Sequence, residues 1–207
     1  MGKGKSVHKI ALMAMLLALA VALGVVDYYI PFPFVPGAKL GLANIVILVV
    51  LYELGVWESA VIDLGRVFIV GLITGRIGQM GFFMSLGGAV ASLLVMILLK
   101  FLARKMTIIG VSACASITHG FAQVAVYCLF VQNLTAFYYY PVMSLIGIAT
   151  GILIGILADR IRATKVIERQ KEHYGFNLPK KEAAGSTTPA AVPLENEKKE
   201  DKKNQQD

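Results

Sequence analysis

The chain has 207 residues, of which 57% are hydrophobic and only 16% are charged, and its formal net charge at pH 7 is +7. A soluble domain usually has about 25% charged residues, whereas residues 1–160 contain only ten Lys and Arg and five Asp and Glu. This composition excludes an ordinary soluble enzyme, a nucleic-acid-binding module and a disordered chain. It predicts an all-α integral membrane protein with a hydrophilic tail.

Six apolar stretches predict six transmembrane helices, because a spanning helix needs about 20 predominantly apolar residues. In chain order they cover residues 10–26, 40–52, 56–74, 81–99, 106–131 and 134–158. The first stretch has the composition of a signal peptide, but the apolar stretches that follow it favour an uncleaved span. The second is short for a span, and the third contains Glu58, Asp63 and Arg66.

The distribution of Lys and Arg predicts the orientation of these helices, because cytoplasmic loops of membrane proteins carry an excess of both residues. Six crossings place both termini on one side of the membrane. Ten cations near helix ends then fall on that side: Lys3, Lys5, Lys9, Arg104, Lys105, Arg160, Arg162, Lys165, Arg169 and Lys171. Lys39 and Arg76 fall on the other side. We therefore predict a multi-pass protein of the cell membrane with cytoplasmic N- and C-termini.

The chain divides into a six-helix transmembrane domain, residues 1–160, and a cytoplasmic tail, residues 161–207. The tail is expected to prolong the last helix to about residue 174 and then to be disordered, since its later part is polar and lacks apolar periodicity. Between the first two helices, residues 27–39 read DYYIPFPFVPGAK. Proline lacks the N–H that a helix requires, so this segment is predicted to be an outer loop. It serves either as a cap over the membrane domain or as an interfacial aromatic belt.

Small residues recur at four-residue spacing in the first and last predicted helices. The first contains Ala14, Ala18 and Ala22, and the last contains Gly147, Gly151 and Gly155. Such stripes allow helix backbones to approach closely in lipid. The glycine stripe is interpreted as internal packing, whereas the alanine stripe fits either internal packing or docking of a partner membrane subunit.

Ionisable groups inside a bilayer are costly, so their positions indicate function. Asp63 and Arg66 are three residues apart on the third predicted helix, so they share a face and can pair. Two interpretations stay open. The two side chains form a structural ion pair that neutralises both, or Arg66 is partly free to bind an anionic ligand.

A polar stripe follows the fifth predicted helix. It consists of Ser112, Ser116, His119, Gln123 and Tyr127, at spacings of four, three, four and four residues. Lipid offers no hydrogen-bond partner, so this stripe must face protein or water. A single His is more often a packing residue than a ligand, but a whole stripe predicts a polar cavity.

Further polar residues, namely Lys39, Arg76, Gln79 and Asn133, lie on the predicted outer side, and Asn44 lies near the start of the second helix. Together these groups predict a pocket that opens outward and carries more positive than negative charge. Such a pocket suits a small anionic or carboxylated solute. The candidate substrate-binding residues are Lys39, Asn44, Arg66, Arg76, His119 and Gln123.

Known catalytic motifs are absent from the sequence. Residues 1–160 contain no DDxxD cluster to hold Mg²⁺ and a diphosphate, and the chain has no Walker loop, GxSxG or HExxH motif. We therefore expect no intrinsic catalysis, no catalytic residue, no metal and no cofactor. Energy for any active transport must come from ions or from a partner.

The chain resembles a bacterial membrane family labelled heptaprenyl diphosphate synthase component I, or Gx transporter. The resemblance covers about the first 160 residues and is most specific in the segments PGAKLGLANI and DLGRVFIVGLITG. That family is similar to the S-components of energy-coupling factor (ECF) transporters, which implies an S-component-like bundle in the bacterial inner membrane that captures a vitamin or precursor solute.

The same resemblance implies two kinds of partner. S-components dock through small residues of their first helix onto a transmembrane subunit that works with two ATPases, and Ala14, Ala18 and Ala22 match that pattern. The family label implies an alternative, in which the chain is a noncatalytic membrane component associated with heptaprenyl diphosphate synthase and menaquinone side-chain synthesis. The other expected partners are the lipid bilayer and, for the uptake protein, a small-molecule solute, and no nucleic acid is expected.

Overall fold

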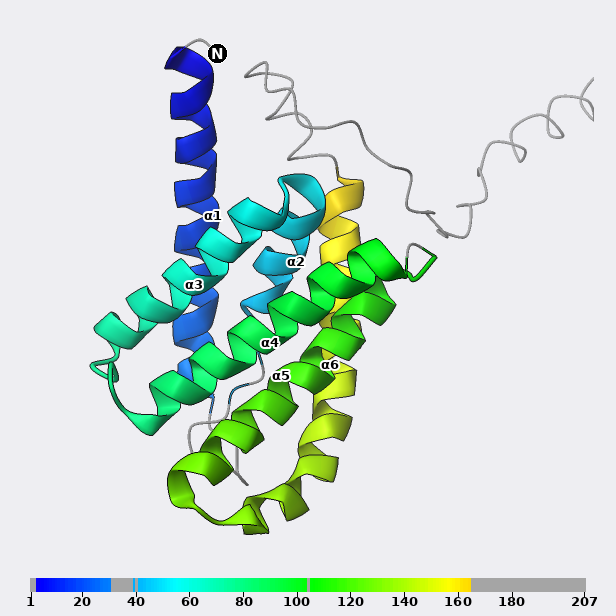
Figure 1. The fold of residues 1–207 in the computed structure, drawn as a ribbon. Coiled ribbons are helices and arrows are strands. Elements are labelled where there is room, and N and C mark those ends of the chain that lie inside the picture. Colours follow the sequence, from blue (N-terminus) through cyan, green and yellow to red (C-terminus); the bar gives the residue numbers. More distant parts are fainter. Residues whose placement is uncertain (1–2, 31–38, 40, 104, 165–207) are drawn as a thin grey trace, which may run out of the picture.

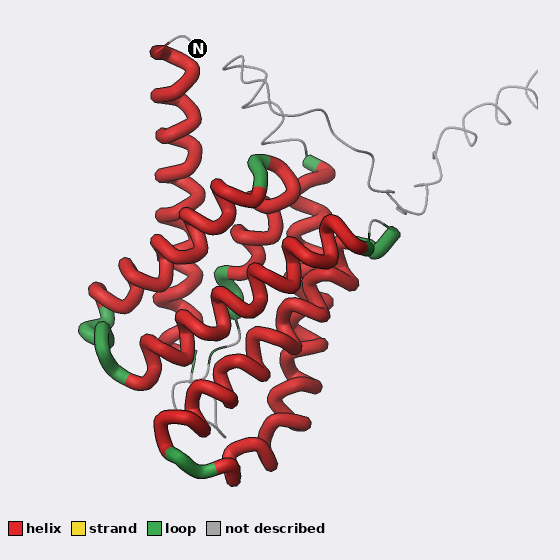
Figure 2. Tube along the Cα trace, in the orientation of Figure 1, coloured by secondary structure: helices red, strands yellow, loops and turns green. Residues whose placement is uncertain are grey.

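The computed structural model describes residues 3–30, 39, 41–103 and 105–164, which form a bundle of six α-helices (Figure 1). The helices are α1 (Lys3–Tyr29), α2 (Asn44–Glu53), α3 (Val56–Ile73), α4 (Met80–Leu102), α5 (Ile108–Val131) and α6 (Tyr140–Ala163). A short 3₁₀ helix, η1 (Leu134–Tyr139), precedes α6. The described part of the chain contains no strand (Figure 2). The predicted all-α class and the six helices are therefore confirmed.

Four of the helices, α1, α4, α5 and α6, are long and apolar enough to cross a membrane. Helix α2 has 10 residues, which span about 15 Å, about half the thickness of a bilayer core. Helix α3 has 18 residues and carries Glu58, Asp63 and Arg66. The bundle is consistent with a membrane protein, while crossing by all six helices stays a prediction.

The start of the last helix differs from the prediction. Residues 134–139 form η1, and α6 begins only at Tyr140. The reason is Pro141, which lacks an N–H and whose ring would clash with a carbonyl one turn earlier if the helix began at residue 134. Proline is tolerated in the first turn of a helix, which is where Pro141 lies.

Helix α2 lies inside the bundle, where it contacts α1, α3, α4 and α6. Its side chains from Val46 to Leu51 are all buried. A helix that is apolar all round is typical of a buried position, so the continuous apolar sequence of α2 explains its central place. The core of the bundle forms around it.

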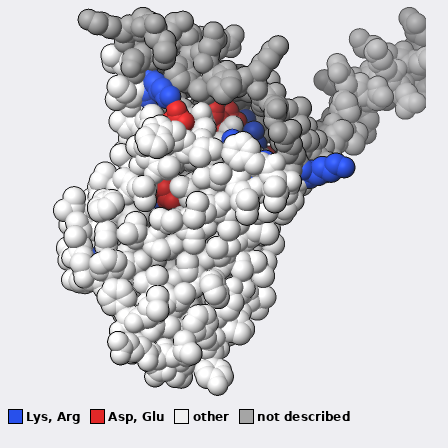
Figure 3. Space-filling model, in the orientation of Figure 1, with Lys and Arg blue, Asp and Glu red and all other residues white. Residues whose placement is uncertain are grey.

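Helix α1 begins and α6 ends at the same end of the bundle (Figure 1). In the space-filling view, the charged side chains gather toward this end and most of the remaining visible surface is uncharged (Figure 3). We refer to five charged residues from five helices as the end cluster: Lys9, Glu53, Glu58, Lys100 and Arg162. That this end faces the cytoplasm stays a prediction from the Lys and Arg distribution.

The end cluster ties the helix ends together through charged contacts. Lys9 of α1 pairs with Glu58 of α3, and Arg162 Nε of α6 donates to Glu53 Oε1 of α2 at 2.8 Å. Lys100 Nζ of α4 donates to a backbone carbonyl in the last turns of α2 at 2.7 Å. These contacts tie α1 to α3, and they tie α4 and α6 to the short central helix.

The glycine stripe of α6 is internal packing, as predicted. A Cβ on Gly155 would lie 2.6 Å from Ile109 Cα, and one on Gly151 would lie 2.8 Å from Ala113 Cα. Only glycine permits this backbone approach between α5 and α6, which make the most extensive helix contact in the bundle. The alanine stripe of α1 differs, because Ala14, Ala18 and Ala22 are all exposed and so do not pack within the described bundle.

Two predictions fall partly or wholly outside the described residues. In the predicted loop 27–39, residues 27–29 belong to the last turn of α1, and residues 31–38 lie outside the described part. In the tail, helix α6 continues to Ala163. The extension to about residue 174 and the disorder after it lie beyond residue 164, the last that the structure describes.

Candidate functional site

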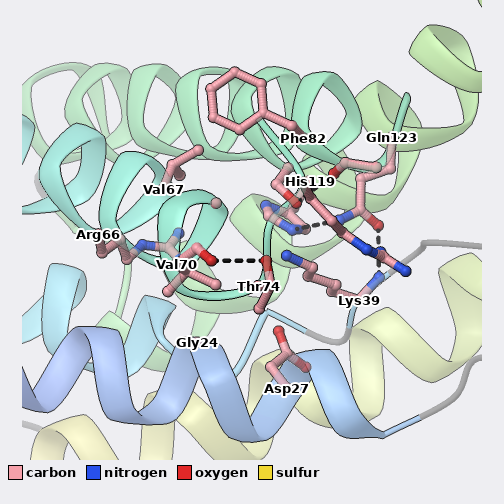
Figure 4. A pocket seen from close by; sticks show the side chains of 14 residues that line it. Gly24, Asp27, Lys39, Arg66, Val67, Val70, Thr74, Phe82, His119 and Gln123 are labelled. Carbon is pink, nitrogen blue, oxygen red and sulfur yellow. Dashed lines mark hydrogen bonds between the residues drawn. The ribbon is translucent and has the colours of Figure 1, made fainter. Parts of the chain in front are cut away.

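A small cavity lies between α1, α3, α4, α5 and the segment that precedes α2 (Figure 4). The described residues enclose about 30 Å³ there. Apolar and glycine positions form part of the wall. The polar side chains that line the cavity are Asp27, Lys39, Arg66, Thr74, Arg76, Ser85, His119 and Gln123.

The structure brings the six candidate residues together. Five of them line the cavity, namely Lys39, Arg66, Arg76, His119 and Gln123. The sixth, Asn44, accepts a hydrogen bond from Arg66. They come from α2, α3, α5 and two connecting segments that are far apart in the sequence. That these side chains bind a substrate stays a prediction.

Two other residues expected near the pocket are not among its described lining. Gln79 is exposed, and its Nε2 donates to a carbonyl in the preceding turn at 3.3 Å. Asn133 is also exposed, and its Oδ1 accepts from Thr135 N at 2.9 Å at the start of η1. Both amides therefore serve local turns instead of the cavity.

Arg66 is held by a buried ion pair and an amide. Its Nε donates to Asp63 Oδ1 at 2.7 Å, and its Nη2 donates to Asn44 Oδ1 at 2.9 Å. Asp63 is 1% exposed and Asn44 2%. The pairing predicted from their three-residue spacing is confirmed, and Arg66 also lines the cavity, so the structural and ligand-facing interpretations are compatible.

Asn44 contributes a further feature. Its Nδ2 is buried and has no hydrogen-bond partner among the residues that the structure describes. It lies 3.1 Å from where a Cβ on Gly41 would stand, and the ring edge of His119 lies 3.6 Å from the same point. A buried amide N–H without an acceptor is costly, which makes this donor notable beside a cavity.

A directional chain of hydrogen bonds links Lys39 to His119 (Figure 4). The backbone N–H of Lys39 donates to Gln123 Oε1 at 3.2 Å, which turns the Gln123 amide N toward His119 Nε2 at 3.0 Å. Because that amide N can only donate, His119 Nε2 must be unprotonated and accept. His119 Nδ1 then faces Ser92 Oγ at 3.4 Å. The network therefore specifies a neutral imidazole with its proton on Nδ1.

Gly88 of α4 makes room for this chain. A Cβ there would lie 2.8 Å from His119 Cε1 and 3.1 Å from Gln123 Cγ. Real Cβ atoms do not approach this closely, so α4 and α5 can carry the network between them only because residue 88 has no side chain.

Asp27 was missed as a site residue, because the sequence placed it in the outer loop. It lies in the last turn of α1, is 2% exposed and points into the cavity (Figure 4). Its Oδ2 accepts from the backbone N of Gly41 at 2.9 Å. A carboxylate directly after a long apolar helix was the signal that could have identified it.

Lys39 lies in the segment between α1 and α2, with charged groups around it. Burial lowers its pKa from 10.5 to about 8, while Asp27 opposes this shift and Arg66 and Arg76 add to it. The guanidinium of Arg76 also lies 4.4 Å from the ring centroid of Tyr28, a cation–π contact. Lys39 is thus cationic near neutral pH but loses its proton more easily than a solvent-exposed lysine.

The polar stripe of α5 does not face one cavity along its whole length. Ser112 and Ser116 pack against two glycines of α6, and Tyr127 packs against an apolar cluster. Only His119 and Gln123 of the stripe are among the described lining residues. The close α5–α6 contact covers the serines, which helical periodicity alone does not reveal.

Among the described residues, no three His, Cys, Asp or Glu side chains converge where they could hold a metal ion. The polar groups at the cavity are mostly cations and hydrogen-bond donors. Chemically, this arrangement is suited to holding negative charge.

Comparison with known proteins gave one match. The sequence model of a family described as heptaprenyl diphosphate synthase component I matches residues 16–161. This range runs from within α1 to the last turn of α6 and includes every described residue that lines the cavity. No curated protein and no solved structure matched the chain.

Proposed function

The chain belongs to the heptaprenyl diphosphate synthase component I family, and on that premise and the cavity's geometry we propose that it is a substrate-binding membrane component, of the ECF S-component type, for uptake of a small anionic solute. One observation carries this proposal: Lys39, Arg66 and Arg76 converge on a single cavity inside an apolar bundle. Ionisable groups at such depth are rare and mark ligand or ion sites by default.

The energetic cost of these groups supports a functional role. A central Arg or Lys costs about 2.5–3.5 kcal/mol on membrane insertion scales, and apolar residues of similar size would fill the same space without that cost. Arg66, 7% exposed within α3, is the cation to which this cost applies, while Lys39 and Arg76 are half-buried in connecting segments beside it. Retaining a buried Arg66 at the cavity is explained if a bound anion offsets the cost.

Each group then has a role. Lys39 and Arg76 supply positive charge, and Arg66 adds a guanidinium that Asp63 and Asn44 hold in place. His119 and Gln123 fix the position of the Lys39 backbone through the hydrogen-bond chain.

The test is anion binding by the purified full chain in a nonionic detergent. A panel of small carboxylates, phosphate and diphosphate is titrated while thermal unfolding is followed, and Lys39→Met and Arg76→Gln are compared with the wild type. Each variant is expected to lose about tenfold in affinity, about 1.4 kcal/mol. Lys105→Met is the matched control, because Lys105 is exposed and outside the cavity. Unchanged affinity in both cavity variants would contradict the proposal.

The proposal includes an energy-coupling partner, a transmembrane subunit with two ATPases. The exposure of Ala14, Ala18 and Ala22 on α1 supports it, since a small-residue stripe that packs nothing within the bundle is available to another helix. Mass spectrometry of proteins that copurify in mild detergent would identify the module. Ala18→Leu is expected to reduce its recovery, whereas Ala149→Leu, an equally exposed change on α6, should not.

The family match favours a second candidate, a noncatalytic membrane component associated with heptaprenyl diphosphate synthase. Its test is elongation of farnesyl diphosphate with isopentenyl diphosphate by the catalytic subunit, with and without this protein. Stimulated elongation without binding of any small anion would favour this candidate over the uptake protein. Anion binding without stimulation would favour uptake.

A further inference from the structure

We propose that the cavity selects a solute with a single negative charge, held as a carboxylate head group, and discriminates against diphosphates. This inference rests on the proposed function, since it names the class of anion that the same cavity binds. It also separates the two candidate functions, because a prenyl diphosphate would place two phosphoryl groups where we assign one carboxylate.

The first argument is the charge around the cavity. Lys39, Arg66 and Arg76 line it as cations and Asp27 as a carboxylate, while Asp63 is bound to Arg66. The sequence has no ionisable side chain at residues 31–38 or 40, which lie outside the described part. The set therefore has a surplus of one positive charge. A buried charge is stable when it is compensated. One added negative charge balances the set, whereas several added negative charges would leave a negative surplus.

The neutrality of His119 is part of this count. Gln123 Nε2 lies 3.0 Å from His119 Nε2, and Gln123 Oε1 is already occupied by the backbone N–H of Lys39. An imidazolium would place two donors against each other at that contact. His119 thus adds no charge while the chain of hydrogen bonds is intact.

The second argument is the kind of polar atom at the cavity. The lysine and arginine side chains that line it are donors only, and Asn44, which accepts from Arg66, has an Nδ2 donor with no partner among the described residues. An ionised oxyanion only accepts, whereas an alcohol or an amine also brings a hydrogen that these donors cannot accept. The donor set explains why the solute is an anion, and the charge count explains why it carries one charge.

The experiment compares acetate, acetamide and diphosphate as probes of the full chain in nonionic detergent at pH 7. All samples contain the same concentration of NaCl, and chloride competes for the cavity. A probe therefore raises the Tm of the protein only if it binds better than chloride. Acetamide has nearly the shape of acetate without its charge. Saturable stabilisation by acetate at millimolar concentrations is expected, with affinity for acetamide and for diphosphate at least about tenfold weaker.

A change of charge in the cavity provides the sharper test. Asp27→Asn keeps an oxygen that can accept from Gly41 N but adds one positive charge to the surplus, so the ratio of diphosphate to acetate affinity is expected to rise about tenfold or more. Asp159→Asn changes the net charge of the protein equally at an exposed position of α6 and should leave the ratio unchanged. If Asp27→Asn does not fold, Lys39→Met serves instead, and it should abolish the preference for acetate over acetamide.

The outcomes separate the inference from the proposed function. Tighter binding of diphosphate than of acetate by the wild type would overturn the single-charge inference while leaving an anion-binding cavity in place. An equal ratio in Asp27→Asn and Asp159→Asn would also overturn it. If neither the wild type nor Lys39→Met binds any of the anions, the proposed function itself is overturned.

Discussion

The bundle contains two groups of charged side chains that differ in how their charges are balanced. In the end cluster, Lys9 and Arg162 each pair with a glutamate of another helix. Lys100 donates to a carbonyl near the end of α2, where the helix dipole is negative. Every cation of the end cluster thus has a negative partner supplied by the fold.

Around the cavity the balance is different. Arg66 is paired with Asp63, but Lys39 and Arg76 face a cavity in which Asp27 is the carboxylate among the described lining residues. The positive surplus there lies away from the charged end of the bundle. The comparison teaches that the end cluster stabilises the arrangement of helices, whereas the cavity charges are incompletely balanced by the described residues.

The largest expected effect is from breaking the buried pair at the cavity. Arg66→Ala leaves Asp63 as an uncompensated charge that is 1% exposed, so the free energy of unfolding is expected to fall by about 3–5 kcal/mol. Unfolding titrations in mixed detergent micelles measure it. The double variant Asp63→Leu with Arg66→Met removes both charges, and it should recover most of the stability without recovering anion binding. A double variant as unstable as Arg66→Ala would show that the pair itself stabilises the bundle.

A smaller effect is expected from closing the space that holds His119. Gly88→Ala places a Cβ 2.8 Å from His119 Cε1, and such overpacking costs about 1–3 kcal/mol. Acetate affinity should fall as well, because the displaced ring no longer fixes Gln123. Gly120→Ala is the matched control on α5, since nothing lies within 4 Å of its Cβ position. It should stabilise the helix by up to about 1 kcal/mol.

The pH dependence of binding tests the charge of Lys39 directly. Its pKa of about 8 predicts that acetate affinity falls by up to about tenfold per pH unit above pH 8. Asp27, Arg66 and Arg76 are the charged groups that face Lys39, and the neutral His119 also lines the cavity. In Lys39→Arg the guanidinium stays charged, so the affinity measured from pH 7 to 9 should become flat. A wild-type profile as flat as that of the variant would contradict the assigned role.

Stability should change in the opposite direction over the same range. Burial lowers the pKa of Lys39 from 10.5 to about 8, so between these values the unfolded chain binds the proton more tightly than the folded one. The contribution of Lys39 to stability therefore rises with pH from about 8 to 10.5 and is lost as pH falls through 8. Denaturation measured without anions, in the wild type and in Lys39→Met, isolates this contribution.

The smallest effect is expected in the end cluster. Lys9→Gln removes a partly exposed pair with Glu58, and such pairs contribute about 1 kcal/mol or less. Acetate affinity should not change, because neither residue lines the cavity. A loss of stability as large as that of Arg66→Ala would remove the distinction between the two groups of charges.

The helices could largely be predicted, because long apolar stretches have few alternatives to helix in a bilayer. The start of α6 could not be read from hydropathy, since residues 134–139 are apolar and only Pro141 indicates the break. The place of α2 was also not predictable from its length. Its ten residues fit inside the bundle because four other helices surround it.

The candidate site was predicted in part. Spacing placed Asp63 and Arg66 on one face, and cost in the membrane singled out His119 and Gln123. Asp27 was not assigned, although a carboxylate at the end of a long apolar stretch is a signal, because its contact with Gly41 depends on the path of the chain back toward α2. The division of the α5 stripe was likewise hidden, since it depends on which residues α6 covers.

The glycine contacts between α5 and α6 also bear on the rigidity of the cavity wall. Two helices whose backbones touch through Gly151 and Gly155 cannot slide past each other without losing that fit. The wall that carries His119 and Gln123 is therefore fixed relative to α6. Asp27 lies instead near the end of α1, whose most extensive helix contact is with α3. The carboxylate of the cavity and its two neutral α5 side chains are thus positioned by separate helix contacts, so a change in one contact need not move the other.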